Sequence, residues 1–261
     1  MFVKGETLVL AAERKIKIIE YVKKNNVASV VQLSEEFNVH EATIRRDLSE
    51  IEKEGFLRRT HGGVVLAEGV SSEPSFTVRV TERVDEKQRI GVLAAGMVKE
   101  GEHIILDSGT TTLQIARNLV KRSNITVVTN DINIAAEFRD SKGIKVLVTG
   151  GILYPESFLL NGMFTNEVLK TLHVHKAFVA TPAIHPKCGL THFEEQLVPA
   201  KRGMIEAAQE VIVVADHYKI GGISLHTVAP PNKIHTLVTG TEATELQIQQ
   251  FEEAGIRVFT A

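Results

Sequence analysis

The chain has 261 residues, 43% of them hydrophobic, which is enough for two domains with cores of their own. Its 30 Lys and Arg residues nearly balance 32 Asp and Glu residues, for a formal net charge of -2. This balance excludes binding of nucleic acid or membranes through overall basic charge, so any basic surface has to be local. A single cysteine, Cys188, excludes an internal disulfide and fits a reducing compartment.

The N-terminus is not typical of a targeting segment. It has about four consecutive apolar residues before Glu13, fewer than the roughly 7–15 of a signal peptide. No segment approaches the ~18 apolar residues of a membrane span. We therefore expect a cytoplasmic protein with no membrane partner.

Helical periodicity predicts a first helix over residues 12–25, with Ile16, Ile19 and Val22 near one face. Lysines lie on the opposite face, and the Asn25-Asn26 pair ends the helix. The pattern is that of an amphipathic helix that covers a small core.

A second helix is predicted to run from Ser29, a plausible N-cap, through Phe37, with Val30 and Leu33 at helical spacing. A tight turn at residues 38–40 follows it.

The third predicted helix, residues 41–55, places Ile44, Leu48 and Ile51 on one stripe and ends at Gly55. The segment FLRRTHGGVVL at 56–66 then contains two short apolar pieces joined by THGG, which predicts a β-hairpin. Helix, helix, turn, helix and hairpin are the layout of a winged helix-turn-helix, here assigned to residues 11–66. Residues 67–85 lose this periodicity and are expected to form a linker.

From residue 86 to 261 short β-branched runs alternate with helical segments, which predicts a doubly wound, mainly parallel sheet with helices on both faces. The predicted strands are HIILD, ITVVT, IKVLVTGG, HKAFVAT, EVIVVAD, KIHTLVT and IRVFTA, and the predicted helices include TTLQIARNLVK, DINIAAEF, NEVLKTL, EEQLVPAKRGMIEAAQ and TEATELQIQQFEEAG.

The third helix carries the chemistry expected of a DNA-reading element. With its apolar stripe inward, Ala42, Arg46 and Ser49 face outward, and Thr43 and Arg45 flank them near the helix start. Arginine can bind guanine or phosphate, and wing residues add backbone contacts. Alternatively, Arg45 and Arg46 merely form a solvated face with Asp47 and Glu50. The candidate DNA contacts are Ser29, His40, Glu41, Ala42, Thr43, Arg45, Arg46, Ser49, Arg58, Arg59, His61, Gly62 and Gly63.

ATIRRDLSEIEKEGFLRRTHGGVVL, with SVVQLSEEFNV before it, closely resembles the signature of the DeoR family of bacterial transcriptional regulators. LDSGTTT, VVTND, VTGG, AKRGMI and ADHYK follow in the order of that family's C-terminal domain, so the resemblance spans about residues 11–240. It implies a sensor domain similar in fold to ribose-5-phosphate isomerase and CoA transferases. This chain has His40 where the family usually has a serine N-cap, which leaves the capping and base contact at that position open.

Polar residues and glycines follow several predicted strands. In open parallel sheets, ligands bind outside the carboxyl ends of the strands. The turn at 108–111 leads into a helix, so its N–H groups favour a phosphate, although Thr110 or Thr111 could equally act only as an N-cap. The candidate effector contacts are Asp107, Ser108, Gly109, Thr110, Thr111, Thr129, Asn130, Asp131, Gly150, Gly151, Lys201, Arg202, Asp216 and Lys219.

The resemblance implies a phosphorylated sugar as the effector and genes of sugar uptake or catabolism as targets. We therefore expect a homo-oligomeric repressor, a dimer or tetramer, that binds a double-stranded DNA operator and has neither a cofactor nor a metal site.

Two other functions are compatible with the residues. A sugar-phosphate isomerase would need a general base, for which Asp107, Glu194, Glu195 and Asp216 are candidates, with Lys201 or Lys219 stabilising an enediolate. A metal ion could bind His185, Cys188 and His192, but a structural zinc site needs four ligands. His173 and His175 are expected to be surface residues or partner contacts.

Overall fold

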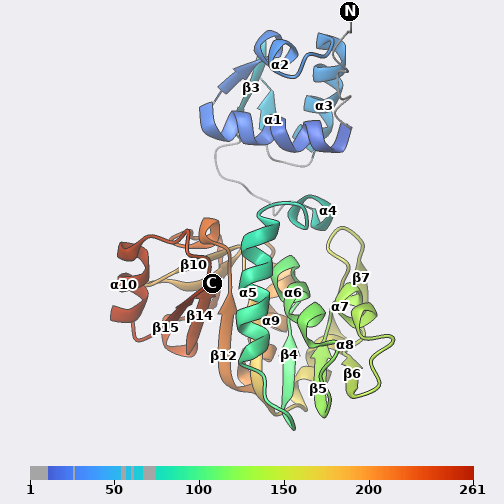
Figure 1. The fold of residues 1–261 in the computed structure, drawn as a ribbon, viewed down its shortest axis with the longest axis vertical. Coiled ribbons are helices and arrows are strands. Elements are labelled where there is room, and N and C mark those ends of the chain that lie inside the picture. Colours follow the sequence, from blue (N-terminus) through green and yellow to red (C-terminus); the bar gives the residue numbers. More distant parts are fainter. Residues whose placement is uncertain (1–10, 26, 54–56, 60–61, 67–74) are drawn as a thin grey trace, which may run out of the picture. The chain divides into compact units, whose positions relative to one another are not determined.

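The computed structural model describes residues 11–25, 27–53, 57–59, 62–66 and 75–261. The chain divides into two compact units, residues 1–78 and 79–261, which we describe separately (Figure 1). No helix among the described residues is both long and apolar enough to cross a membrane.

The first unit has the helices and the hairpin that the sequence predicts. Its elements are α1 (Ala11–Asn25), β1 (Val27–Ser29), α2 (Val30–Glu36), α3 (Glu41–Lys53), β2 (Leu57–Arg59), β3 (Gly63–Leu66) and α4 (Phe76–Arg79). The strand β1, which was not predicted, pairs with β3 and completes an antiparallel sheet of order β1-β3-β2. The predicted helix ends at Asn26 and Gly55 lie outside the described residues.

The core of the first unit is built around the apolar stripe of α3. Ile44, Leu48 and Ile51 are fully buried, as predicted. On α1 the prediction was wrong in one position, because Ile18 rather than Ile16 is in the core. Arg14, four residues before Ile18, is also buried, so the inward face of α1 runs through these two positions. Ile16 lies at the margin of this face and is only partly buried.

Part of the segment expected as a linker is helical. The short helix α4 and the start of α5 (Val84–Gly96) both lie within residues 75–85, while residues 67–74 lie outside the described part. Val78 packs partly buried against the core of the first unit.

The second unit is the predicted α/β domain. Its seven-stranded sheet is parallel throughout, with strand order β15-β14-β12-β9-β4-β5-β6. Its strands are β4 (His103–Leu106), β5 (Ile125–Thr129), β6 (Ile144–Val148), β9 (Val174–Ala180), β12 (Ala208–Val214), β14 (Thr236–Thr239) and β15 (Arg257–Thr260). The main helices are α5, α6 (Thr110–Leu119), α7 (Ile132–Glu137), α8 (Met163–Lys170), α9 (Val198–Ala207) and α10 (Glu245–Glu253).

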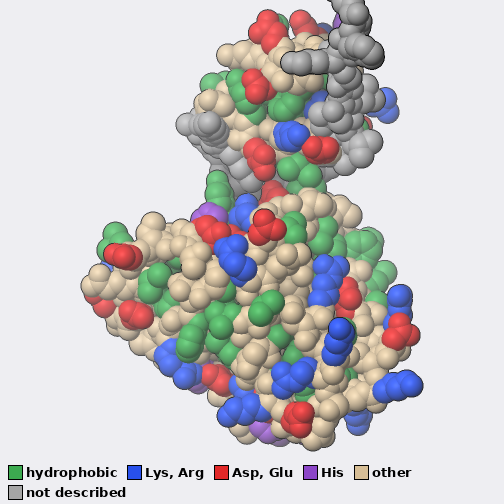
Figure 2. All heavy atoms as spheres, in the orientation of Figure 1, with side chains coloured by type: hydrophobic (Ala, Val, Ile, Leu, Met, Phe, Trp, Pro, Cys, Tyr) green, Lys and Arg blue, Asp and Glu red, His purple; other side chains and the backbone are tan. Residues whose placement is uncertain are grey.

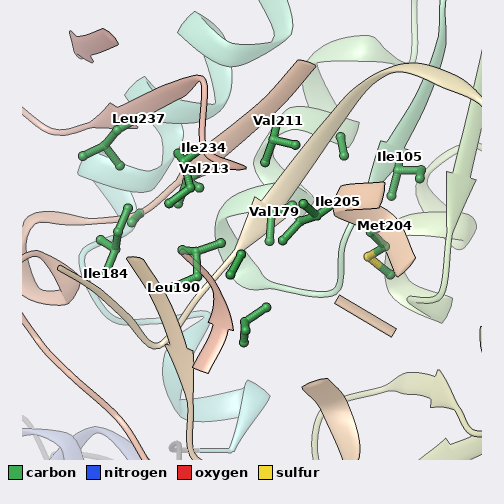
Figure 3. Packing of buried hydrophobic residues seen from close by; sticks show 14 of the residues in the cluster. Ile105, Val179, Ile184, Leu190, Met204, Ile205, Val211, Val213, Ile234 and Leu237 are labelled. Carbon is green, nitrogen blue, oxygen red and sulfur yellow. The ribbon is translucent and has the colours of Figure 1, made fainter. Parts of the chain in front are cut away.

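Helices cover both faces of this sheet. α5 and α6 lie on one face, and α8, α9 and α10 contribute to a buried apolar cluster on the other (Figure 1). Figure 3 shows Ile105 and Val179 of the sheet beside Met204 and Ile205 of α9. The inner strands β5, β9 and β14 are nearly continuous apolar runs, as expected of strands with both faces buried.

Two smaller sheets were not predicted. The strands β10 (Ala183–His185), β11 (Gly189–His192) and β13 (His226–Ala229) form a three-stranded antiparallel sheet. The hairpin of β7 (Ile152–Tyr154) and β8 (Leu159–Asn161) follows the end of β6. Each of these strands has only three or four residues, too few for a reliable alternation of polar and apolar side chains.

The strand register brings the predicted effector residues to one edge of the sheet. Leu106, the last residue of β4, pairs with Thr129 and Phe178 in its neighbours, and Val214 of β12 pairs with Ala180 of β9. Residues that follow these strands therefore share the carboxyl edge, where open parallel sheets bind ligands.

Candidate functional site

The outer face of α3 carries the predicted DNA-contacting residues. Ala42, Arg45 and Arg46 are exposed, and Thr43 and Ser49 are partly exposed. The side chain of Arg46 retains 83% of its accessible surface. The helix therefore presents two arginines near its N-terminal half, where a recognition helix contacts base edges.

Each of the two arginines has an acidic partner on α3. Arg45 Nη2 lies 2.7 Å from Glu41 Oε2, and Arg46 Nε lies 3.6 Å from Glu50 Oε1. Glu50 also accepts a hydrogen bond from Lys15 Nζ of α1 at 2.8 Å, and this bond is the main cause that lowers the pKa of Glu50. Exposed pairs of this kind contribute little stability, so DNA phosphates can replace the carboxylates at low cost.

Asp47 does not belong to this exposed face, contrary to the solvated-face alternative. Its side chain is buried and receives two hydrogen bonds from Arg14, Nε to Oδ2 at 2.6 Å and Nη2 to Oδ1 at 3.2 Å. This forked pair ties α3 to α1 and fixes which face of the recognition helix points outward.

His40 takes over the capping position that a serine would occupy. Its Nδ1 accepts a hydrogen bond from the N–H of Ala42 at 3.3 Å, and its carbonyl accepts from Thr43 and Ile44. Ser29 is the N-cap of α2, as predicted: its Oγ accepts from Gln32 N, and the Gln32 side chain accepts from Ser29 N.

The wing is an antiparallel pair of β2 and β3, with Arg58 opposite Val65. The side chains of Arg58 and Arg59, and the whole of His61, lie outside the described part of the chain. Gly63 has a packing reason to be glycine, because a Cβ there would lie 2.1 Å from the carbonyl oxygen of Ala28 in β1. Gly62 is exposed, with nothing within 4 Å of such a Cβ, and its carbonyl accepts from Val30 N.

In the second unit, Asp107 lies at the centre of a buried cluster directly after β4. Its Oδ2 receives Lys201 Nζ of α9 at 2.5 Å and the N–H of Ala180 at 3.1 Å, and its Oδ1 receives Ser108 N at 2.9 Å. Lys201 Nζ also donates to the carbonyl of Ala180 at 2.8 Å. Burial raises the pKa of Asp107, against the lowering effect of Lys201 and the two backbone donors.

Ser108 connects this cluster to the end of β5. Its hydroxyl donates to Asp131 Oδ2 at 2.7 Å, while Asp131 Oδ1 accepts from the N–H groups of Asn133 and Ile134. Asp131 is thus the N-cap of α7, and burial raises its pKa. Asn130, the residue before it, donates to the carbonyl of Leu160 in β8.

The turn from β4 into α6 leaves the start of the helix without a side-chain cap. The N-cap of α6 is Gly109, with no side-chain cap, so neither Thr110 nor Thr111 is the cap that the alternative required. Thr112 donates its hydroxyl to the Gly109 carbonyl. The first-turn N–H groups of a helix have no intrahelical acceptor, and the helix dipole adds positive potential there.

Gly150 and Gly151 form a tight turn after β6 in the left-handed backbone region, with φ values of 73° and 123°. A Cβ on Gly151 would lie 2.5 Å from the carbonyl oxygen of Asn161. Thr165 of α8 donates to the Gly150 carbonyl at 2.6 Å. The turn is therefore held close to β8 and α8 at the same edge of the sheet.

The comparisons with known proteins agree with this two-unit arrangement. The profile of the DeoR-like helix-turn-helix domain matches residues 14–70, and that of the DeoR C terminal sensor domain matches residues 82–241. The chain belongs to the DeoR family.

Two relatives of this DeoR-family chain are similar over most of their length. The HTH-type transcriptional regulator GolR of Listeria innocua is 32% identical over 94% of this chain and 97% of that protein. The HTH-type transcriptional repressor GlcR of Bacillus subtilis is 35% identical over 87% of each chain. Among solved structures, the ribose 5-phosphate isomerase A of Methanocaldococcus jannaschii is 17% identical, with a TM-score of 0.40 over 53% of this chain and 55% of that one.

The DeoR-family motifs do not all converge on one point. Arg202 turns away from Lys201, because consecutive helical residues point about 100° apart. Its guanidinium donates to the carbonyls of Thr227 and Val228 in β13 at 2.7 and 3.1 Å. The structure therefore places Arg202 outside the Asp107 cluster.

Asp216 lies after β12 and is engaged by other residues. Its Oδ1 accepts from Tyr218 N and lies 3.1 Å from Arg83 Nε, with its side chain 2% exposed. Lys219 ends the 3₁₀ turn that Asp216 begins. Nothing in the sequence indicated Arg83 as a partner, since the two residues are far apart in the chain.

The positions of the candidate general bases give no support to the isomerase alternative. Asp107 and Asp216 are each held in an ion pair, whereas Glu194 and Glu195 are exposed. The relatives GolR and GlcR are named as a transcriptional regulator and a transcriptional repressor, not as isomerases.

The histidines singled out for a metal site have backbone partners. His185 Nδ1 accepts from Lys187 N, and His192 Nδ1 accepts from Glu194 N. His175 Nδ1 likewise accepts from His103 N. Among the described residues, the group of metal-ligand types that does come together is another one, Glu86, His217 and Glu242, and its members already bind one another or Arg89.

Proposed function

We propose that this chain is a transcriptional repressor that binds operator DNA through α3 and the wing, and that a phosphorylated sugar at the carboxyl edge of the large sheet changes its DNA affinity. The observation that carries the first half is the outward face of α3, with Arg45 and Arg46 exposed over a buried Ile44, Leu48 and Ile51 stripe. The GlcR relative, a repressor by name, supports the direction of regulation.

The second half of the proposal is supported by the turn at residues 108–112. A glycine N-cap leaves the α6 N-terminus without a side-chain cap, while Asp107 and Asp131 hold the turn from both sides. Such a helix start favours anions, and phosphate is one of the anions that bind there. The hydroxyls of a sugar would reach the polar residues after β5 and β6.

Asp107 and Lys201 have a supporting role in this proposal. Both are buried and bound to each other and to the backbone of Ala180. They hold the turn at residues 108–112 and the end of β9 in place, while the turn itself contacts the ligand.

Gel shifts with DNA from upstream of the protein's own gene test the first half. Arg46→Ala should lower operator affinity by roughly 5–150-fold, the range of about 1–3 kcal/mol for a bidentate base contact. Arg139→Ala is the matched control, because Arg139 is an exposed arginine of the sensor unit that pairs with its neighbour Asp140. Equal affinity of both variants would contradict the assignment of α3.

A panel of hexose and pentose monophosphates, added to the same gel shift and to a thermal-shift assay, tests the second half. Thr110→Val removes one hydroxyl from the turn at residues 108–112, and we expect it to weaken binding of the active compound about tenfold or more. Thr126→Val, the same change in the first half of β5, should leave binding unchanged. A wild-type protein that responds to no compound of the panel would contradict the sensor assignment.

A further inference from the structure

A group of charged residues joins the start of the sensor unit to the end of β12. We call it the junction cluster and define it as Arg83, Glu86, Lys87, Asp216 and His217. Arg83 and Lys87 lie at the beginning of α5, and Asp216 and His217 follow β12. Asp216, Glu86 and Lys87 are each at most 3% exposed, so these charges are held almost completely away from water.

The contacts within the junction cluster are specific. Arg83 Nε lies 3.1 Å from Asp216 Oδ1, and the guanidinium stands over the Tyr218 ring at 5.0 Å. Glu86 accepts from His217 N at 2.7 Å and lies 2.9 Å from His217 Nδ1. Arg83 Nη2 also donates to Glu82 Oε2 at 2.8 Å. Asp216 is the more deeply buried partner, so removal of the Arg83 guanidinium would leave a buried carboxylate without the cation that pairs with it.

Arg83 adopts a conformation that its own side chain does not favour. It has φ 47° and ψ 43°, the left-handed region, immediately before α5. A residue with a Cβ is held in this region only where surrounding contacts determine it. The ion pair with Asp216 is such a contact, so the backbone turn at residue 83 depends on a residue after β12.

Lys87 connects the cluster to α4. Its ammonium group donates to the carbonyl of Arg79, the last residue of α4, at 2.5 Å. Arg79 is the first residue of the second unit, and the preceding Val78 packs against the core of the DNA-binding unit. The junction cluster therefore fixes the point where the chain leaves the sensor unit for the DNA-binding unit.

The opposite end of the cluster leads to the proposed effector site. Asp216 stands two residues after Val214, which pairs with Ala180 of β9. The N–H and the carbonyl of Ala180 are bound by Asp107 and Lys201. A ligand that shifts the turn after β4 would act on Ala180, then on the end of β12 and on Asp216.

We propose that the Arg83–Asp216 pair, together with Lys87 on the Arg79 carbonyl, is a latch that holds the junction in the DNA-competent arrangement. This inference rests on the proposed function, because the latch regulates that sensor. With the latch closed, residues 79–87 are held in one conformation on the sensor unit. With it open, residues 75–87 gain conformational freedom, and ordering them again on DNA costs affinity.

The latch is tested without any ligand by amide hydrogen exchange on the full-length protein. Asp216→Asn keeps the side-chain shape but removes the charge, and Lys87→Met removes the donor to Arg79. Both should speed exchange in residues 79–87. Arg83→Lys, which keeps the charge, should stay closer to wild type. The control is Glu210→Gln, which removes an exposed carboxylate paired with Arg257 on the same unit.

Operator affinity of the same variants gives the second measurement. We expect Asp216→Asn and Lys87→Met to weaken operator binding about tenfold, within the 5–150-fold range usual for coupled sites, and Glu210→Gln to stay within twofold of wild type. Thermal unfolding of each variant is the control that tests whether the sensor unit is folded at the assay temperature.

The outcomes separate the latch from the proposed function. Unchanged exchange in residues 79–87 of both variants would overturn the latch, as would faster exchange with operator affinity within twofold of wild type. Absence of operator binding by the wild type would instead overturn the proposed function, while the exchange result would still report on the junction.

Discussion

At the scale of single residues, two acidic side chains of the sequence motifs form buried ion pairs within the fold. Asp47 stands within the arginine-rich recognition helix but binds Arg14 of α1, and Asp107 stands within the effector turn but binds Lys201 of α9. Of their neighbours, Arg46 is exposed, and Ser108 is partly buried and donates its hydroxyl to Asp131. A motif residue can thus serve the site by positioning the residues beside it.

Asp47→Asn should destabilise the DNA-binding unit by about 3 kcal/mol, because it removes the carboxylate charge that pairs with the buried Arg14 guanidinium. Urea unfolding followed by circular dichroism measures this loss. Glu13→Gln is the control: it removes the exposed pair with Lys17, and should cost no more than about 0.5 kcal/mol. Equal losses in the two variants would show that the Arg14 pair contributes no more than a surface one.

Lys87 should give the protein a characteristic pH dependence. Burial, the largest cause, lowers the pKa of Lys87 from 10.5 to about 8, while Asp216 and Glu82 raise it and Arg83 and Lys219 lower it. Between these two values the unfolded chain binds the proton and the folded chain does not, so stability rises with pH.

The corresponding gain is about 3 kcal/mol from pH 8 to 10.5. It is measured as the unfolding free energy of wild type minus that of Lys87→Met, a difference in which the other lysines cancel. If this difference in unfolding free energy does not change between pH 8 and 10.5, Lys87 has the same pKa in the folded and the unfolded chain.

At the scale of elements, the wing depends on the close approach of β1 and β3. Gly63→Ala places a Cβ 2.1 Å from the Ala28 carbonyl oxygen, so the strands must separate. We expect a loss of about 1–3 kcal/mol in stability, the cost of overpacking, and weaker operator binding. Gly62→Ala introduces the same methyl group where nothing lies within 4 Å, and should be nearly neutral in thermal unfolding. Similar losses in both variants would contradict this account of the wing.

The elements also show what sequence periodicity can predict. The stripe Ile44, Leu48 and Ile51 and the seven parallel strands were predicted, because these signals lie within one window of the chain. The strands β1, β7, β10 and β13 were missed because three or four residues carry too little pattern. The partners of Asp47 and Asp216 were missed for another reason: such pairs depend on the fold that brings distant residues together.

At the scale of the whole molecule, DNA binding has to depend on local groups of basic side chains, because the overall charge is not basic. The chain has a net charge of -2, and Figure 2 shows acidic and basic side chains interspersed over the visible face. A DNA-binding unit with two exposed arginines on one short helix gains affinity for DNA chiefly when two such units bind as a symmetric pair. We therefore expect the protein to bind DNA as a homo-oligomer of 28.7 kDa chains.

Hydroxyl-radical footprinting on the operator should show two protected half-sites, with centres about 10–10.5 base pairs apart or at a multiple of that spacing. Inserting about half a helical turn, roughly 5 base pairs, between them should weaken binding more than inserting a full turn of about 10, because only the full turn restores both half-sites to one face of the duplex. Sedimentation of the free protein gives the matching number of chains. A monomeric mass together with a single protected half-site would contradict the symmetric arrangement and would require all of the affinity to come from one α3 and one wing.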